Sequence, residues 1–408
     1  MANVSSSNGL EKRPKLRFPG FDEPWRVEKL GQISSLIKRN DPRSNAPIMM
    51  LSAGNGFIMQ SDKYSRDNAG QSLKKYTLLK KGELAYNHGA SKAKQFGCCY
   101  ELREEEARIP YVYHCFKVRG TEYAPYVALE LNNTKMDKQL KRLVSSSVRM
   151  DGLLNISYDE YMSVVVYLPA YAEQKHIADF LEKLDMRIAK QKQLVESLKK
   201  YKRGVVQQVF SERNENKRTR YPEWKLSSLG EYFTEQTIRT SNSSATPLVS
   251  LTVENGITPK TERYYREFLV TKEGDNYKAI KPGWFAYNPM NAHLGAIAPN
   301  HLGYTAAVSG YYNIFSVNEI DTVDFWEEYL TSYPMLIHYK LIATGSLIEK
   351  QRVHYSQFVG IRRKLPSLEE RKHLSKIFQA LNAKITNAES MEHQLIKLRT
   401  SLLQQLFI

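Results

Sequence analysis

The 408-residue sequence carries one pattern twice, at a spacing close to half its length. The segment Leu168–Phe210 recurs as Leu365–Phe407. Both copies begin with Leu-Pro, share a Lys-His pair and end in Gln-Gln, an aliphatic residue and Phe. These matches share an offset of 197 without a gap. Solenoid units are only about 20 to 50 residues long. The period therefore predicts two copies of one globular domain, each followed by a long helix.

Shorter matches extend the repeat toward the N-terminus of each half. Trp25–Gly31 matches Trp224–Gly230, and Gly82–Asn87 matches Gly283–Asn288. The offsets drift between 197 and 201, so the copies differ by small insertions in loops.

The repeated segments have the apolar spacing of coiled-coil helices. Apolar positions alternate in steps of four and three, which is a heptad pattern. A basic residue interrupts each pattern at the same place, Lys202 in one segment and Arg399 in the other. Pro169 and Pro366 precede the helices, where proline is tolerated. The predicted seam comprises Ile177, Leu181, Leu184, Ile188, Val195, Leu198 and Val205, with Leu374, Phe378, Leu381, Ile385, Leu395 and Leu402.

Each segment of roughly 37 residues would form a helix on the order of 55 Å long. A helix of that length does not bury its apolar stripe within one small domain, so it needs a partner helix. We expect the two copies to pair antiparallel in the same chain. Packing of each helix on its own domain, or pairing between chains, are the alternatives.

The remaining sequence indicates α+β domains rather than helices alone. Runs rich in Val, Tyr and Phe, bounded by Gly, Pro and Asn, predict strands. The expected strands lie in Pro110–Val118, Tyr161–Tyr167, Trp284–Tyr287 and Tyr311–Val317, and Thr322–Lys340 is expected to be helical. The predicted organisation is a disordered lead over 1–19, globular domains over 20–167 and 213–364, and helical segments over 168–212 and 365–408.

The composition favours a polyanionic partner. Lys and Arg number 59 against 43 Asp and Glu, a formal net charge of +16. Such a balance favours nucleic acid before membrane, although a protein can be basic without such a partner. No apolar run reaches the roughly 18 residues of a membrane span, and the N-terminus does not resemble a signal peptide. Three cysteines without zinc-site spacing suit the reducing cytoplasm.

Basic and polar residues between the expected strands are the candidate DNA contacts. Lys and Arg bind phosphates, while Asn, His and Tyr read base edges or pack on sugars. Tyr86–Lys92 and Tyr287–His293 occupy the same place in the repeat, although Asn also serves turns well. The candidates are Lys63, Arg66, Lys74, Tyr86, Asn87, His88, Lys92 and Lys94 in the first copy, and Lys260, Arg263, Arg266, Tyr287, Asn288, Asn291 and His293 in the second.

The sequence contains no familiar catalytic or cofactor motif. It has neither a GxxxxGK[ST] phosphate loop nor GxGxxG. Asn288–Asn291 is superficially like the Asn/Asp-Pro-Pro-aromatic motif of amino-methyltransferases, but it lacks the second proline and the aromatic residue. The histidines show no metal-site spacing, so we expect no metal. A nuclease site assembled from separated Asp, Glu and Lys residues stays open.

Three stretches together resemble the specificity (S) subunit of type I restriction-modification enzymes. They are the domain openings Phe18–Gly31 and Tyr221–Gly230, the pattern LP-x3-EQ-x2-IA-x-FL-x2-LD over Leu168–Asp185, and the run Lys281–Phe315. The second copy of the pattern departs at two positions, where Arg371 stands for Gln174 and Asn382 for Asp185.

The resemblance implies two target-recognition domains, each reading one half of an asymmetric, bipartite site in double-stranded DNA. It implies that the helices form an antiparallel coiled coil, set the gap between the half-sites and dock two methyltransferase (M) subunits. Two restriction (R) subunits would join for cleavage. S-adenosylmethionine, ATP and Mg would belong to those partners, so this chain would be non-catalytic and carry no cofactor.

The helix length gives an independent estimate of the gap. About 55 Å, set against about 34–36 Å per DNA turn, places the half-site centres roughly 1.5 turns apart. Two other functions remain as alternatives. One is a self-contained DNA methyltransferase or nuclease with duplicated DNA-binding domains, and the other is a basic coiled-coil adaptor for RNA or protein.

Overall fold

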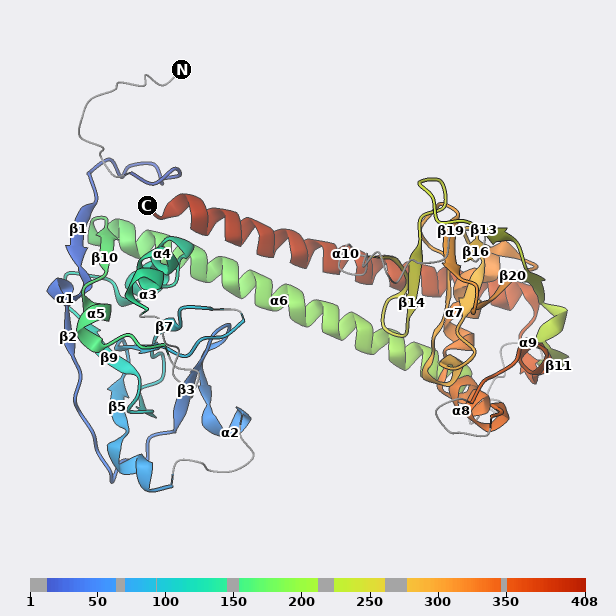
Figure 1. Ribbon diagram of the computed structural model, residues 1–408, viewed down its shortest axis with the longest axis horizontal. Coiled ribbons are helices and arrows are strands. Elements are labelled where there is room, and N and C mark those ends of the chain that lie inside the picture. The colour runs from blue at the N-terminus through green and yellow to red at the C-terminus, as the bar shows by residue number, and fades with distance from the viewer. Residues whose placement is uncertain are drawn as a thin grey trace, which may run out of the picture. The chain divides into compact units, whose positions relative to one another are not determined.

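The computed structural model describes residues 13–63, 70–92, 94–144, 154–211, 224–260, 277–345 and 351–408. The chain forms two compact units. The first comprises 1–191 and 391–408, and the second comprises 192–390. Two long helices, α6 (Tyr171–Phe210) and α10 (Leu368–Leu406), each contribute to both units (Figure 1). Both units mix small antiparallel sheets with helices, so the fold is mixed α and β.

The first unit is built around a four-stranded antiparallel sheet in the order β2-β9-β6-β7. Two-stranded pairs β3–β4 and β5–β8 flank it, and β1 pairs with β10 directly before α6. Its strands are β1 (Arg26–Lys29), β2 (Ser34–Leu36), β3 (Met49–Ser52), β4 (Gly56–Met59), β5 (Thr77–Lys80), β6 (Leu84–Asn87), β7 (Cys98–Glu101), β8 (Glu106–Ile109), β9 (His114–Val118) and β10 (Val165–Leu168). Its short helices are α1 (Leu30–Ile33), α2 (Gln60–Lys63), η1 (Gly70–Lys75), α3 (Ala124–Leu131), α4 (Thr134–Leu143) and α5 (Tyr158–Met162).

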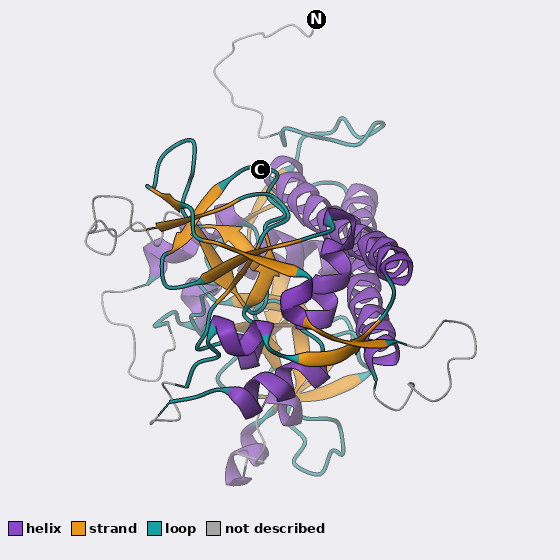
Figure 2. Cartoon of the chain, turned by 90° about the vertical axis from the view of Figure 1, so that its right-hand side faces the viewer, coloured by secondary structure: helices purple, strands orange, loops and turns teal. Residues whose placement is uncertain are grey.

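The second unit has a four-stranded sheet in the corresponding order, β12-β20-β17-β18. Figure 2 shows the strands and helices of the chain coloured by type. Here β11 pairs with β21 directly before α10. The strands are β11 (Lys225–Ser228), β12 (Phe233–Gln236), β13 (Arg239–Thr240), β14 (Val249–Thr252), β15 (Gly256–Pro259), β16 (Tyr277–Ile280), β17 (Phe285–Tyr287), β18 (Ile297–Pro299), β19 (Ala306–Ser309), β20 (Asn313–Val317) and β21 (Arg362–Leu365). The helices are η3 (Leu229–Glu231), η6 (Ala292–Leu294), η7 (Ile320–Thr322), α7 (Val323–Leu330), α8 (Tyr333–Ile342) and α9 (Tyr355–Val359).

Two of the expected elements are wrong in part. Thr322–Lys340 is not one helix, because α7 ends at Leu330 and α8 begins at Tyr333 with Pro334 in its first turn. Proline lacks the amide donor that a continuing helix needs. The start of the expected strand Tyr161–Tyr167 is the end of α5, which a capping box between Ser157 and Glu160 begins.

An aromatic stack lies at the same place in the core of each unit. Tyr86 on β6 stacks on Tyr161, with ring centroids 3.8 Å apart. Tyr287 on β17 stacks on Phe358, with centroids 4.9 Å apart. All four rings are at most 1% exposed. The stacks join the central sheet of each unit to the short helix, α5 or α9, that precedes the long helix.

Every residue of the predicted helix seam is buried or half-buried. In the first unit, Ile177 and Leu181 of α6 share one core with Leu406 of α10. The guanidinium of Arg399 also bonds both carboxylate oxygens of Asp185, one of them at 2.9 Å. In the second unit, Val205 and Val209 of α6 pack on the core that holds Leu374 and Phe378 of α10. The end of one long helix therefore packs beside the start of the other within each unit.

Part of the expected disordered lead makes specific contacts. The amide of Leu16 donates to the carbonyl of Gln405 at 3.0 Å, and Arg17 bonds Glu173 with two contacts of 2.8 Å. Phe18 packs edge-on against His176 at 4.4 Å. Residues 13–19 are thus ordered against the long helices, which corrects the predicted end of the lead at 19, while 1–12 lie outside the described residues.

Two further observations concern membrane-spanning helices and the cysteines. Among the described residues, no helix is both long and apolar enough to cross a bilayer. Cys98, Cys99 and Cys115 are buried free thiols.

Candidate nucleic-acid interface

Three residues predicted to contact DNA lie instead in the core. Tyr86 and Tyr287 form the buried stacks, and Tyr86 also donates to the carbonyl of Phe96 at 2.6 Å. His88 is buried, with its ring nitrogens 2.7 Å and 2.9 Å from the carbonyls of Leu154 and Val112. Side chains that are 6% exposed or less offer no base-reading surface, so the structure contradicts the assignment of these three to a DNA surface.

Asn87 and Asn288 have the same local role in the two units. The side-chain oxygen of Asn87 accepts from the amide of Gly89 at 2.9 Å. That of Asn288 accepts from the amide of Met290 at 3.1 Å. Both are Asx turns, in which the side chain takes the place of a backbone acceptor. These turns explain why Asn recurs in the repeat, and they engage the side-chain oxygen that base reading would also use.

The other predicted contacts are at least partly accessible wherever the structure describes them. Lys63, Lys74, Lys92 and Asn291 are exposed, and Lys94, Lys260 and His293 are half-buried. Lys94 donates to the carbonyl of Asn132 at 2.5 Å, so its position is fixed. Arg66, Arg263 and Arg266 lie outside the described residues. A DNA role for the accessible group stays a prediction.

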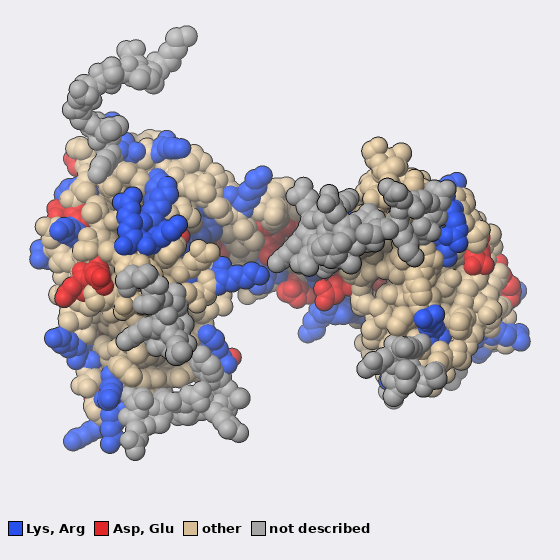
Figure 3. Space-filling model, in the orientation of Figure 1, with Lys and Arg blue, Asp and Glu red and all other residues tan. Residues whose placement is uncertain are grey.

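The structure adds a basic surface that the sequence reading missed. Helix α4 buries Met136 and Leu140 and exposes Lys138, Lys141 and Arg142 on its opposite side. Lys and Arg side chains gather over this part of the first unit in Figure 3. The signal was present in the sequence, because cations at i, i+3 and i+4 share one helix face.

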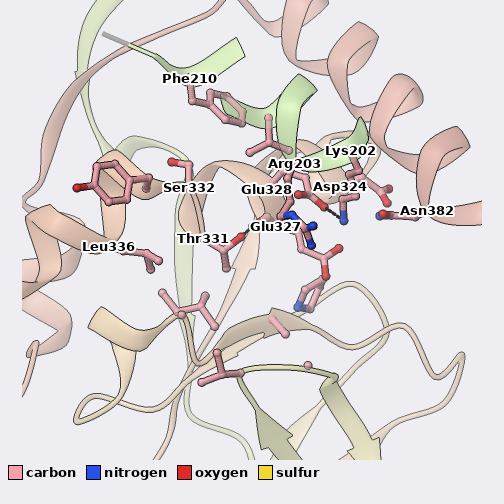
Figure 4. Close-up of a pocket in the computed structure, with 18 of the residues that line it drawn as sticks. Lys202, Arg203, Phe210, Asp324, Glu327, Glu328, Thr331, Ser332, Leu336 and Asn382 are labelled. Carbon is pink, nitrogen blue, oxygen red and sulfur yellow. Dashed lines mark hydrogen bonds and ion pairs between the residues drawn. The ribbon is translucent and has the colours of Figure 1, made fainter. Parts of the chain in front are cut away.

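The corresponding helix of the second unit exposes apolar side chains instead. Tyr333, Ile337 and Leu341 of α8 are 75%, 42% and 76% exposed. They line a groove of about 1820 Å³, which also borders the end of α6 and residues of α10 (Figure 4). Exposed Val253 and Leu294 belong to the same lining. An apolar ridge of this kind suits packing against another surface rather than binding phosphates.

One wall of this groove carries a cluster of titratable groups (Figure 4). Nε2 of His301 lies 2.8 Å from a carboxylate oxygen of Glu327, and this hydrogen bond raises the pKa of His301. Burial raises the pKa of Asp324. One ligand atom from each residue lies within 4.8 Å of the others, a spacing that a metal ion tolerates. With a single imidazole already paired to Glu327, the arrangement is that of an ion-pair network.

The Glu-Gln of the LP-x3-EQ pattern anchors the start of α6. Glu173 is 1% exposed and receives the bonds of Arg17. The side chain of Gln174 donates to Glu122 at 2.6 Å and accepts from the amide of Tyr123 at 2.9 Å. Arg26 on β1 completes the network with a 2.6 Å ion pair to Glu122. The motif therefore joins the long helix to its globular domain.

In the second unit, the start of α10 is attached to its globular domain through different charged groups. Glu370 receives a 3.2 Å bond from the indole of Trp224. Arg371, which stands where the first unit has Gln174, is buried and donates to the carbonyl of Pro366 at 2.8 Å. Its guanidinium lies 4.0 Å from Glu319 and packs over the ring of Tyr232 at 4.5 Å. The cation near the half-buried Glu319 thus comes from the helix.

Comparisons with known proteins show what this architecture resembles. No family model matches the sequence, and no curated protein gives a significant match. Among solved structures, the S subunit of a type I restriction-modification system from M. genitalium is similar, with 13% identity and a TM-score of 0.61. The match covers 97% of this chain and 99% of that one.

A second similar chain comes from a structure described as showing complex assembly and conformational transition of the type I R-M system. It has 14% identity and a TM-score of 0.53, covering 96% of this chain and 99% of that one. Both matches extend over nearly the entire chain. The protein therefore has the fold of a type I S subunit.

Proposed function

We propose that this chain is the DNA sequence-specificity subunit of a type I restriction-modification complex. The observation that carries the proposal is the end-to-end match to an S subunit, which covers 97% of this chain. The net charge of +16 is an independent support, because a DNA-reading subunit gains affinity from phosphate contacts.

In this proposal the chain contains two copies of a target-recognition domain, and each reads one half of a bipartite site in double-stranded DNA. The corresponding sheet orders β2-β9-β6-β7 and β12-β20-β17-β18 support duplication. The accessible loop residues differ between the copies, as with Lys92 in one and Asn291 with His293 in the other. Different surfaces read different bases, so the target is asymmetric.

The two long helices act in this proposal as an antiparallel coiled-coil spacer and as the docking site for two M subunits. The buried seam and the cross-helix pair Arg399–Asp185 support pairing between α6 and α10. Two R subunits would complete the complex for cleavage. S-adenosylmethionine, ATP and Mg would act on those partners, and this chain would contribute recognition without catalysis.

A methylome tests the proposal directly. The chain is expressed with its M subunit in a host that lacks DNA methylation, and modified adenines are mapped by single-molecule sequencing. We expect one asymmetric, split motif with a fixed gap, which disappears when this chain is omitted. A folded M complex that yields no motif would contradict the proposal. Methylation or cleavage by the purified chain alone would favour the self-contained enzyme.

The spacer role has its own test. Inserting seven residues into α6 and seven into α10, at facing positions, preserves the heptad register. We expect the unread gap to lengthen by about three base pairs, given roughly 10.5 Å of added helix and about 3.4 Å per base pair. Both half-sites should stay the same. A change in a half-site sequence would contradict the spacer role.

A further inference from the structure

Two helices at corresponding positions of the units present faces of different chemistry. In each helix the apolar residues at i, i+4 and i+7 face the unit, and they include the buried Met136 and Leu140 of α4 and Met335 and Tyr339 of α8. The outward residues of α4 include three cations, whereas those of α8 are apolar apart from Lys340. We call Lys138, Lys141 and Arg142 the α4 basic face.

Among the described residues, the α4 basic face has no carboxylate partner for its charges. All three side chains are exposed, and none forms an ion pair with any carboxylate in the part of the chain that the structure describes. The nearby acid, Asp137, is half-buried, and Lys94 lies close enough to lower its pKa against the larger effect of burial. The charge of Asp137 is therefore offset by Lys94 and leaves the three outward cations uncompensated.

The α4 basic face adjoins the candidate DNA-reading loop. Lys94 closes that loop onto the α3–α4 junction through the carbonyl of Asn132. The same loop carries the exposed Lys92. The basic loop and the α4 basic face therefore lie on neighbouring elements, linked through Lys94. At the same place in the second unit, Leu294, Ile337 and Leu341 are exposed, and Lys340 is the one exposed cation of α8.

We propose that the α4 basic face binds the phosphate backbone of duplex DNA that flanks the half-site read by the first unit. This inference rests on the proposed function and adds a sequence-independent contact to it. From Lys138 to Arg142 the helix rises about 6 Å, which matches about two nucleotides of one strand at about 3.4 Å each. Three donors without acceptor groups suit phosphate oxygens.

The contact serves one half of the complex only. Affinity gained through phosphate contacts falls as the salt concentration rises. Binding releases counterions from the DNA, and this release is less favourable when the solution already contains more salt. Binding of the first half-site should thus be more salt-dependent than binding of the second. A role limited to helix stability is the competing explanation, since cations in the last turn interact favourably with the helix dipole. Lys138 lies outside that turn, and the two roles give different readouts.

The test uses the complete complex with its M subunits. A variant with Lys138→Gln, Lys141→Gln and Arg142→Gln is compared with the wild type for duplex DNA affinity between 50 and 200 mM salt. We expect the slope of log affinity against log salt to shrink by about 1 for each lost phosphate contact. Affinity for target and non-target duplexes should fall by the same factor, and the methylation motif should not change.

Two matched variants complete the design. Lys340→Gln changes the α8 residue that corresponds to Lys141, and we expect the slope to stay at its wild-type value. Replacing Lys138 and Lys141 by Arg keeps the charges, and we expect the wild-type slope even if helix stability shifts. Circular dichroism on every variant shows whether α4 is folded.

Three results would overturn the inference. The slope of the triple Gln variant could equal that of the wild type, in which case DNA does not contact α4. The variant could instead fail to assemble with M subunits, which would make the face a protein-docking surface. Third, a changed methylation motif would show base reading rather than backbone contact. In each case a wild-type complex that still yields a split motif leaves the proposed function standing.

Discussion

The two copies of the repeated motif differ at Gln174/Arg371 and at Asp185/Asn382. At both positions, the charged partner lies on a different element in the two units. The first unit holds Glu122 with Arg26 from β1 and places neutral Gln174 on the helix. The second unit brings the cation on the helix itself, as Arg371 near Glu319. A buried carboxylate needs a cation or donors nearby, but the fold accepts that cation from either element.

The second difference follows the same rule. Arg399 interrupts the seam of α10 and binds Asp185 across the helix pair. Lys202 interrupts the seam of α6 at the matching place, but its counterpart acid is replaced by Asn382. Lys202 instead forms an ion pair with Glu328 on α7. Each basic interruption therefore pairs with an acid, which lies on the facing long helix in the first unit and on α7 in the second.

The largest expected effect comes from removing the aromatic stack that the units share. Tyr86→Ala and Tyr287→Ala should each lower the free energy of unfolding of the affected unit by about 3–5 kcal/mol, because both rings are fully buried. Hydrogen exchange read by mass spectrometry measures each unit separately. Asn291→Ala, on an exposed residue, should stay within about 0.5 kcal/mol. If the second unit exchanges hydrogen equally fast in Tyr287→Ala and Asn291→Ala, Tyr287 does not lie in the core.

A pH dependence should distinguish the units next. Burial raises the pKa of Glu130 to about 8, although the amide of Tyr167 and the side chain of Asn133 bond its oxygens. The folded state therefore holds a proton that the unfolded state releases above its ordinary pKa of about 4.3. This contribution to stability is complete below that value and is lost as pH rises through about 8.

Between those values the first unit should lose at most about 1.4 kcal/mol per pH unit from this group. The second unit has Tyr329 at the corresponding position and should lack this contribution, although burial also raises the pKa of the neighbouring Glu328. Glu130→Gln keeps the shape without the titration, so exchange rates of the first unit, corrected for intrinsic chemistry, should become flatter with pH. An unchanged pH profile in Glu130→Gln would show that another group is responsible.

Moving the cation of the second unit should have a smaller effect. Arg371→Gln leaves Glu319 without its nearby cation and removes the packing on Tyr232, for a loss of about 1–3 kcal/mol. We expect a loss in the lower part of that range, because the Glu319 side chain is one-third exposed and solvent screens its ion pair. Adding Lys225→Arg copies the first unit's Arg26 and should recover part of the loss. If the double variant is no more stable than Arg371→Gln, the two joints are not interchangeable.

The smallest stability effect is expected at the outward face of α8. Ile337→Lys with Leu341→Arg copies the α4 basic face onto this helix. Both side chains are exposed, so the free energy of unfolding should change by no more than about 0.5 kcal/mol per site. Loss of assembly with M subunits would show that the apolar ridge is a protein-binding surface. If assembly is kept and the second unit also borders DNA, the slope of log affinity against log salt should become steeper.

Local sequence determined the long helices and their seam. Pro169 and Pro366 fix where the helices begin, and the alternating four-three spacing fixes which residues turn away from water. The structure places every predicted seam residue in a buried or half-buried position. These properties depend on residues within a few positions of one another, which is why one sequence with an internal copy was enough to predict them.

Contacts between distant residues were decided only by tertiary structure. Tyr86 reads as a polar aromatic beside a loop, and its burial depends on Tyr161, which folds onto it from α5. The joint of Glu122, Gln174 and Arg26 likewise brings together residues 52 and 96 positions apart. Spacing along the chain sets which side of a helix or strand a residue faces. Whether that side meets water, a carboxylate or another ring depends on how the elements pack.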